Sequence, residues 1–186
     1  MRRLDERCTH LALLRGINVG GKKMLPMRDL TALFEQAGCE NVRTYIQSGN
    51  VPFEATPATA ERFANGVASQ IEARFGFRVP MMLRSAAEMS AAISGNPFVQ
   101  EGADENALHV GFLRDAPNAQ QVRQLAPDRS PPDRFAVKGR EIYLHLPNGM
   151  GRTKLTNDYF DRRLGTVSTV RNWRTVMKLS ELMGCR

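Results

Sequence analysis

The residues best suited to chemistry form a glycine-rich, basic stretch near the N-terminus, residues 16–23, with the sequence GINVGGKK. Its spacing nearly matches the phosphate-binding loop G-x-x-x-x-G-K-[ST], where glycines let backbone N–H groups converge on phosphate oxygens and lysine neutralises charge. Lys23 stands where that loop has the hydroxyl residue that holds magnesium. We therefore expect a simpler anion-binding loop, or else a basic surface loop that binds nothing. Its candidate binding residues are Arg15, Asn18, Gly20, Gly21 and Lys22.

Two stretches in the second half place basic residues beside expected helix starts, where backbone N–H groups favour an anion. The first is GRTKLTN and the second is VRNWR. Trp173 is either a core anchor or an aromatic platform for a base or ring. The candidate binding residues here are Arg152, Lys154, Asn157, Arg171, Asn172 and Trp173.

A fourth stretch, TYIQSGN, reads as the turn of a hairpin and adds Gln47, Ser48 and Asn50 to the candidate binding residues. Ser48 lacks the Gly-x-Ser-x-Gly setting of a nucleophile, and no histidine can be tied to it. The three histidines fall in expected strands. The sequence therefore identifies no catalytic residue.

Composition narrows the class of protein. The 186 residues carry a net charge of +7, and residues 150–178 hold seven basic side chains against two acidic ones. This balance favours an anionic partner. Three cysteines without paired spacing and scattered histidines predict neither a disulfide framework, nor a metal site, nor a cofactor, and fit a reducing cytoplasm. The apolar runs are too short for a membrane span, and the acidic residues near the N-terminus argue against a secretory signal.

The elements that must position these residues follow the order β-α-β-β-α-β twice, which is the ferredoxin-like plan. We expect an α+β fold with one such half in residues 1–97 and another in 98–186, helices packing on mixed or antiparallel sheets. The first half is expected to have strands at 9–15, 42–47, 51–54 and 78–84, with helices from Pro26, Thr56 and Ser85. The second is expected to have strands at 108–113, 134–138, 141–146 and 167–170, with helices at 115–126, 153–164 and 171–183.

Four stretches together resemble the domain-of-unknown-function family 1697, whose members are mostly bacterial. They are LLRGINVGGKK at 13–23, TYIQSGNVPF at 44–53, GMGRTKLTN at 149–157 and TVRNWRTVMKL at 169–179. The resemblance implies a compact α+β fold with two ferredoxin-like halves. It implies no activity, so function rests on the residues themselves.

Three functional hypotheses stay open. The first is binding of a phosphate-bearing ligand, a nucleotide or a nucleic acid, through the basic glycine-rich loops. Nucleic acid is the weaker option, because the first strand has no aromatic residue on which a base could stack. The second is an enzyme acting on a phosphorylated small molecule. The third is a protein-interaction module without a small ligand.

Overall fold

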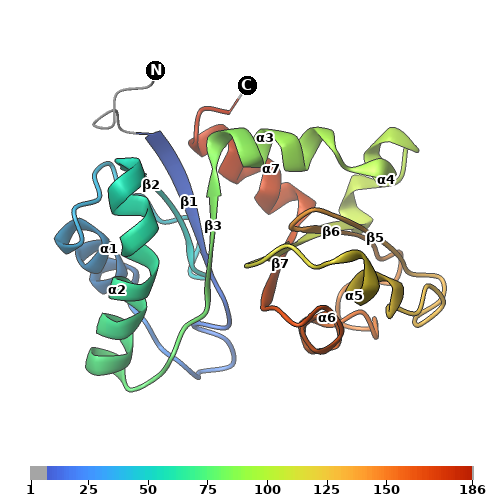
Figure 1. Ribbon diagram of the computed structural model, residues 1–186, viewed down its shortest axis with the longest axis horizontal. Coiled ribbons are helices and arrows are strands. Elements are labelled where there is room, and N and C mark those ends of the chain that lie inside the picture. The colour runs from blue at the N-terminus through green and yellow to red at the C-terminus, as the bar shows by residue number, and fades with distance from the viewer. Residues whose placement is uncertain (1–7, 186) are drawn as a thin grey trace. The chain divides into compact units, whose positions relative to one another are not determined.

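The computed structural model describes residues 8–185, which divide into two compact units (Figure 1). The first unit contains the described residues up to Ser90 and those from Leu179 onward, and the second spans Ala91–Lys178. The acidic residues that argue against a secretory signal precede Cys8 and lie outside the described residues. No helix in the part described is long and apolar enough to cross a membrane.

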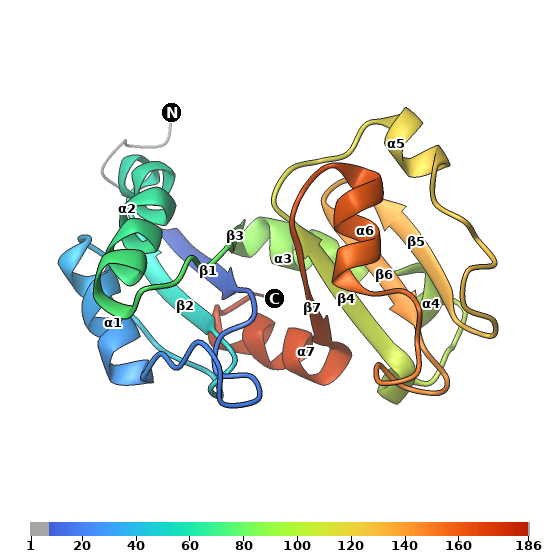
Figure 2. The ribbon, with the colours of Figure 1, turned by 90° about the horizontal axis from the view of Figure 1, so that it is seen from below.

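The first unit is a three-stranded antiparallel sheet with two helices on one face (Figures 1 and 2). Strand β1 lies in the centre of the sheet, in the order β2-β1-β3. The elements are β1 (Cys8–Leu14), α1 (Met27–Gln36), β2 (Asn50–Ala55), α2 (Pro57–Phe75) and β3 (Met81–Ser85). Helix α2 begins as its sequence predicts, with the Thr56 side chain accepting a hydrogen bond from the Thr59 N–H and Pro57 in the first turn.

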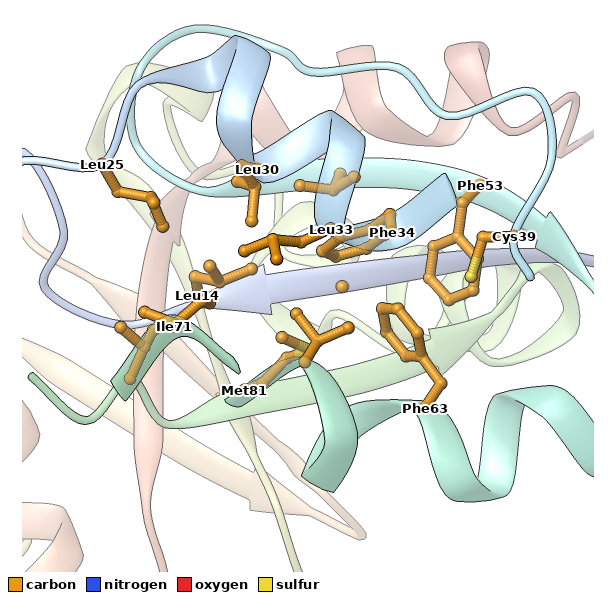
Figure 3. Packing of buried hydrophobic residues seen from close by; sticks show 14 of the residues in the cluster. Leu14, Leu25, Leu30, Leu33, Phe34, Cys39, Phe53, Phe63, Ile71 and Met81 are labelled. Atoms are coloured by element: carbon orange, nitrogen blue, oxygen red, sulfur yellow. The ribbon is translucent and has the colours of Figure 1, made fainter. Parts of the chain in front are cut away.

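The core of the first unit lies between this sheet and the two helices. Ala12 and Leu14 of β1 alternate with residues of the opposite face, as a strand requires. Phe34 of α1 packs edge-on against Phe63 of α2, with ring centroids 4.5 Å apart, and both rings contact Phe53 of β2 (Figure 3). Such aromatic contacts add about 0.5–1.5 kcal/mol each beyond the burial of apolar area.

The strand expected at 42–47 is wrong. Residues 40–45 are joined to β2 by two isolated bridges, from Glu40 to Glu54 and from Tyr45 to Asn50, and by a hydrogen bond of 2.9 Å from the Arg43 N–H to the Pro52 carbonyl. The register slips by one residue between the two bridges, and Asn41 has a left-handed φ of 49° in that interval. An extra residue of this kind interrupts a ladder as a β-bulge does, so no continuous strand forms.

The second unit is a four-stranded antiparallel sheet in the order β5-β6-β4-β7. Its elements are α4 (Pro97–Gln100), β4 (Leu108–Leu113), α5 (Ala119–Arg123), β5 (Arg134–Lys138), β6 (Glu141–His145), α6 (Asn157–Leu164) and β7 (Ser168–Asn172). Helices α3 (Ala86–Ser94) and α7 (Trp173–Leu182) begin in one unit and end in the other. Helix α6 packs on the sheet face that carries Ile142 and Leu144, burying Phe160 and Leu164 (Figure 2).

Three expected helix starts in this unit are wrong by two to four residues. Helix α5 begins at Ala119, because Asn118 forms a capping box with Gln121. Helix α6 begins at Asn157, because the Thr156 side chain accepts from the Tyr159 N–H. Arg171, expected in a helix, is the fourth residue of β7. In each case a capping side chain or a strand pairing competes with the apolar periodicity on which the prediction relied.

Candidate functional site

The glycine-rich loop of the first unit is a tight β-hairpin. Val19 and Lys22 pair as an antiparallel bridge, and the Lys22 N–H donates to the Val19 carbonyl at 3.0 Å. The two residues between them, Gly20 and Gly21, have φ of 57° and 73°. Positive φ at both central positions is the signature of a type I′ turn, which glycine adopts without strain. Gly20 and Gly21 are thus explained by the turn, and the amide of Lys22 is used within it.

The side chain of Asn18 ties this hairpin to a second loop. Its Nδ2 donates to the carbonyl oxygens of Leu25, at 3.0 Å, and Gln47, at 2.9 Å. Its Oδ1 accepts from the Leu25 N–H at 2.7 Å. All three bonds hold the protein's own backbone, so Asn18 positions the loop. The structure brings the first and second of the family-like stretches together at this point.

Residues 45–50 form the turn that Asn18 reaches. Asn50 is buried, and its Nδ2 donates to the Tyr45 carbonyl and to the Ser48 Oγ, at 3.1 and 3.0 Å. Gly49 is required by its neighbours, because a Cβ there would lie 2.6 Å from the Cβ of Leu14. Ser48 and Asn50 therefore stabilise the turn. Gln47 is exposed and, with Asn18 and Arg28, lines a hollow of about 400 Å³.

Two sequence candidates of the first unit remain as cations. Arg15 is half-buried, and its backbone N–H donates a hydrogen bond to the Pro80 carbonyl at 2.9 Å. The Lys22 side chain is exposed on the hairpin. Asn18, Ser48 and Asn50 make hydrogen bonds that hold the two loops, and Gly20 and Gly21 form the turn of the hairpin.

In the second unit, Arg152 and Lys154 lie in an exposed loop that ends at Thr156, ahead of α6 and not within it. The Lys154 N–H donates to the Ser130 Oγ at 3.0 Å, and the Lys154 carbonyl accepts from the Arg129 Nε at 3.1 Å. Both the N–H and the carbonyl of Lys154 are thus hydrogen-bonded to a loop about 24 residues earlier in the chain. We call residues 129–130 and 149–156 the basic loop pair.

The chemistry around the basic loop pair includes groups that the sequence analysis missed. The Arg129 guanidinium lies 4.2 Å from the centre of the Tyr159 ring, and Tyr159 OH accepts from the Ala126 N–H. Ser130 Oγ donates to Asp133 Oδ2 at 2.7 Å. Arg129 and Ser130 stand in a proline-rich segment whose spacing from Lys154 carries no periodic signal, so no sequence pattern links them.

The other second-unit candidates connect secondary-structure elements. Asn157 Oδ1 accepts from Ser168 Oγ at 3.3 Å and so joins α6 to β7. Asn172 Oδ1 accepts from the Thr175 N–H at 2.8 Å, which caps α7. Arg171 donates from Nη1 to the Thr169 Oγ1 and to the Val170 carbonyl. Burial lowers the pKa of Arg171 to about 10.

Trp173 is a core residue, only 3% exposed. Its Nε1 is buried without a hydrogen-bond partner among the described residues. Part of the residue lines a hollow of about 460 Å³ with Glu105, Asn172 and Arg174. The indole is therefore not an open platform on which a base could stack.

The histidines do not form a catalytic group in the part of the chain described. His10 stacks on Phe53, with ring centroids 5.6 Å apart, and burial lowers its pKa. Burial also lowers the pKa of His109. Across residues 8–185, no three His, Cys, Asp or Glu side chains gather as a metal site would require.

Comparison with known proteins places the chain in a family. A family model described as "Protein of unknown function (DUF1697)" matches residues 8–143. The chain belongs to the DUF1697 family. This DUF1697 protein is also similar to a solved structure titled as conserved bacterial protein SP0830 from Streptococcus pneumoniae. The two share 19% identity with a TM-score of 0.70, over 96% of this chain and 99% of the other. That likeness concerns the fold alone, and no curated protein matches the DUF1697 chain.

Proposed function

We propose that this protein binds a phosphate-bearing ligand, a nucleotide or a nucleic acid, through the basic loop pair of its second unit. The observation that carries the proposal is the pair of hydrogen bonds that join Arg129 and Ser130 to the backbone of Lys154. A loop held on both sides of one residue loses less conformational freedom when it binds. Arg152 and Lys154 keep their side chains exposed, as cations that bind phosphate must.

The local charge supports an anionic ligand. Residues 149–156 contain Arg152 and Lys154 and no acidic residue, and Arg129 adds a guanidinium whose Nε is already oriented. Guanidinium groups bind phosphate oxygens through paired N–H donors, whereas lysine acts as a point charge. The expected contacts are therefore from Arg129 and Arg152 to phosphate oxygens, with Lys154 adding charge.

We also propose that the chain consists of ferredoxin-like halves and that it works in the cytoplasm. Both sheets have the strand order of a ferredoxin-like βαββαβ unit, if residues 40–45 are counted as the edge strand of the first. We therefore propose two ferredoxin-like halves in tandem. Cys8, Cys39 and Cys185 form no disulfide among the described residues, which supports a reducing cytoplasm as the working environment.

The test is a titration of the full chain at low, fixed salt against inorganic phosphate, nucleoside mono-, di- and triphosphates, sugar phosphates, and short RNA and DNA. Thermal melting reads out binding, since a ligand at 100 times its Kd stabilises the native state by about 2.7 kcal/mol. We expect one phosphate class to raise the Tm, and we expect Arg152→Ala or Lys154→Ala to abolish the rise. Arg74→Ala, an exposed arginine of the first unit, is the charge-matched control. A panel without any shift, or a shift equal in all variants, would remove the proposal.

A further inference from the structure

Three large apolar side chains are exposed on the two loops that Asn18 joins in the first unit. Val19 is 64% exposed, Met24 57% and Ile46 54%. Val19 lies next to Asn18 in the chain, and Ile46 lies next to Gln47, to whose carbonyl Asn18 donates. Single exposed apolar residues are ordinary, but here three lie on two loops that one side chain holds together. We call residues 16–28 and 45–50 the paired loops.

The backbone of the paired loops is left-handed at three residues other than glycine. Asn18, Lys23 and Ile46 have φ of 55°, 49° and 50°. For Ile46 this is a costly conformation, since a β-branched side chain fits the left-handed region poorly. Strain of this kind persists only where surrounding structure imposes it, and it concentrates at functional sites. Here it holds an apolar side chain in solvent, the opposite of what stability favours.

The paired loops also enclose a hollow of about 400 Å³, lined in part by Met24, Met27, Arg28 and Gln47. Leu25 anchors its floor, because it is fully buried in the core of the first unit (Figure 3). Methionine side chains are flexible and adapt to varied apolar groups, so they recur at surfaces that bind peptides. The hollow therefore has an adaptable rim on a fixed base, and it has room for an apolar side chain.

The charge of the paired loops has one sign. The paired loops contain Lys22, Lys23 and Arg28 and no acidic residue, and Asp29, which directly follows them, lies with its Oδ1 3.8 Å from the Arg28 Nε. Lys22, Lys23 and Arg28 are exposed, and the Arg28 side chain is 94% exposed. A partner that covers this surface must bring negative charge as well as an apolar group.

We propose that the paired loops bind an acidic polypeptide segment that inserts a large apolar side chain into this hollow. The carboxylates of the segment meet Lys22, Lys23 and Arg28. Its apolar side chain packs in the hollow against Met24 and Met27, and the residues beside it cover the exposed Ile46. A single-stranded nucleic acid fits less well, because Tyr45 is the one aromatic residue of the paired loops, and bases need aromatic faces on which to stack. A membrane surface has no single group to fill a hollow. This inference is independent of the phosphate site of the second unit.

The experiment selects binders from a random library of displayed twelve-residue peptides, using the full chain, and measures the enriched sequence by fluorescence anisotropy. We expect enrichment of peptides that carry several Asp or Glu residues around one Leu, Ile, Met or Phe. Ile46→Asn should raise the Kd of the enriched peptide at least tenfold. The double variant Lys22→Glu, Lys23→Glu should raise it by at least the same factor. Asn tolerates positive φ, so Ile46→Asn removes the apolar side chain without adding strain. Val99→Asn, an exposed valine of α4, is the matched control and should leave binding unchanged.

The competing outcomes each overturn the inference. These are a library without enrichment, enriched peptides that lack acidic or apolar residues, and peptides bound equally by Ile46→Asn. Phosphatidylserine vesicles and a short RNA are titrated in parallel. Ile46-dependent binding to either of them in place of peptide also overturns it. Arg152→Ala should leave peptide binding unchanged. Failure of phosphate binding in the second unit can therefore be distinguished from failure of peptide binding in the first.

Discussion

Asn18 and Gln47 are 29 residues apart in the chain and are joined by a hydrogen bond of 2.9 Å from the Asn18 side chain to the Gln47 carbonyl. The same amide group satisfies both the N–H and the carbonyl of Leu25. The Asn18 side chain thus joins the glycine-rich hairpin both to the 45–50 turn and to Leu25, which is buried in the core. Asn18, a candidate anion-binding residue from the sequence, therefore also positions both loops.

Removing the Asn18 side chain should destabilise the first unit, because its three hydrogen bonds are lost. We expect Asn18→Ala to lower the free energy of unfolding by about 1–3 kcal/mol, because backbone groups of Leu25 lose their partner and alanine is strained at φ of 55°. Asn18→Gly relieves the strain but not the lost bonds, so its effect should be smaller. Urea unfolding of both variants measures the difference. Equal stability of Asn18→Ala and the wild type would mean that water replaces the amide without cost.

A second prediction separates steric contact from backbone conformation. Gly49 and Gly76 have nearly the same φ, 74° and 76°, but only Gly49 is crowded. A Cβ at Gly49 would lie 2.6 Å from the Cβ of Leu14, whereas nothing lies within 4 Å at Gly76. We expect Gly76→Ala to cost about 1 kcal/mol, from the left-handed conformation alone. Gly49→Ala should cost at least about 2 kcal/mol more, because the turn must move off β1.

Urea unfolding of the two variants, measured in the same buffer, tests this comparison. If Gly49→Ala and Gly76→Ala destabilise the protein equally, the contact with Leu14 yields without cost and Gly49 serves conformation only.

Much of the fold was predictable because its strongest signals are local. The hairpin of β5 and β6 is confirmed, and Gly139 at its turn has the positive φ of 58° that the Gly-Arg sequence predicts. The start of α2 follows from Thr56 and Pro57. The segment after Glu40 was not predictable, because its apolar and polar residues alternate as in a strand while Asn41 breaks the register.

The candidate site was less predictable, since its contacts join segments far apart in the chain. A glycine-rich stretch is equally consistent with a phosphate-binding loop and with a type I′ turn, and the φ values of Gly20 and Gly21 and the Lys22 to Val19 hydrogen bond show the turn. The position of Arg129 beside Lys154 depends on how two irregular loops pack, which no periodicity encodes. The exposure of Ile46 was hidden for the same reason, because a β-branched residue between Tyr45 and Gln47 reads as part of a strand.

Acid should destabilise the protein through its half-buried imidazoles. Burial lowers the pKa of His10 and of His109 below 6.5, so the folded state favours the neutral rings. This contribution is fully present above the unfolded pKa of about 6.5 and is lost as the pH falls towards the folded pKa values. We expect the free energy of unfolding to fall between pH 7 and pH 5, with at most about 1.4 kcal/mol per pH unit from each histidine.

The measurement is urea unfolding across that pH range for the wild type and for His10→Gln. A variant that cannot take up the proton should lose less stability on acidification. If the two pH profiles run parallel, His10 is not part of the acid response.

The final prediction concerns Ser130, whose Oγ links Lys154 to Asp133. Ser130→Ala removes the acceptor of the Lys154 N–H and the donor to Asp133 Oδ2, while leaving every cation of the basic loop pair in place. Asp133 Oδ1 already lacks a partner among the described residues, so the variant leaves a buried carboxylate without its donor. We expect a loss of about 1–3 kcal/mol in unfolding free energy.

Phosphate binding tests the positioning role directly. If the held backbone of Lys154 matters for affinity, Ser130→Ala should weaken the ligand found in the thermal-shift panel at least fivefold with net charge unchanged. Ser130→Thr keeps the hydroxyl and should restore both stability and affinity, which a purely electrostatic site would not require. Isothermal titration of the three proteins at fixed salt gives the three Kd values. Equal affinity in Ser130→Ala and the wild type would show that the cations alone bind the ligand, whatever holds the loop.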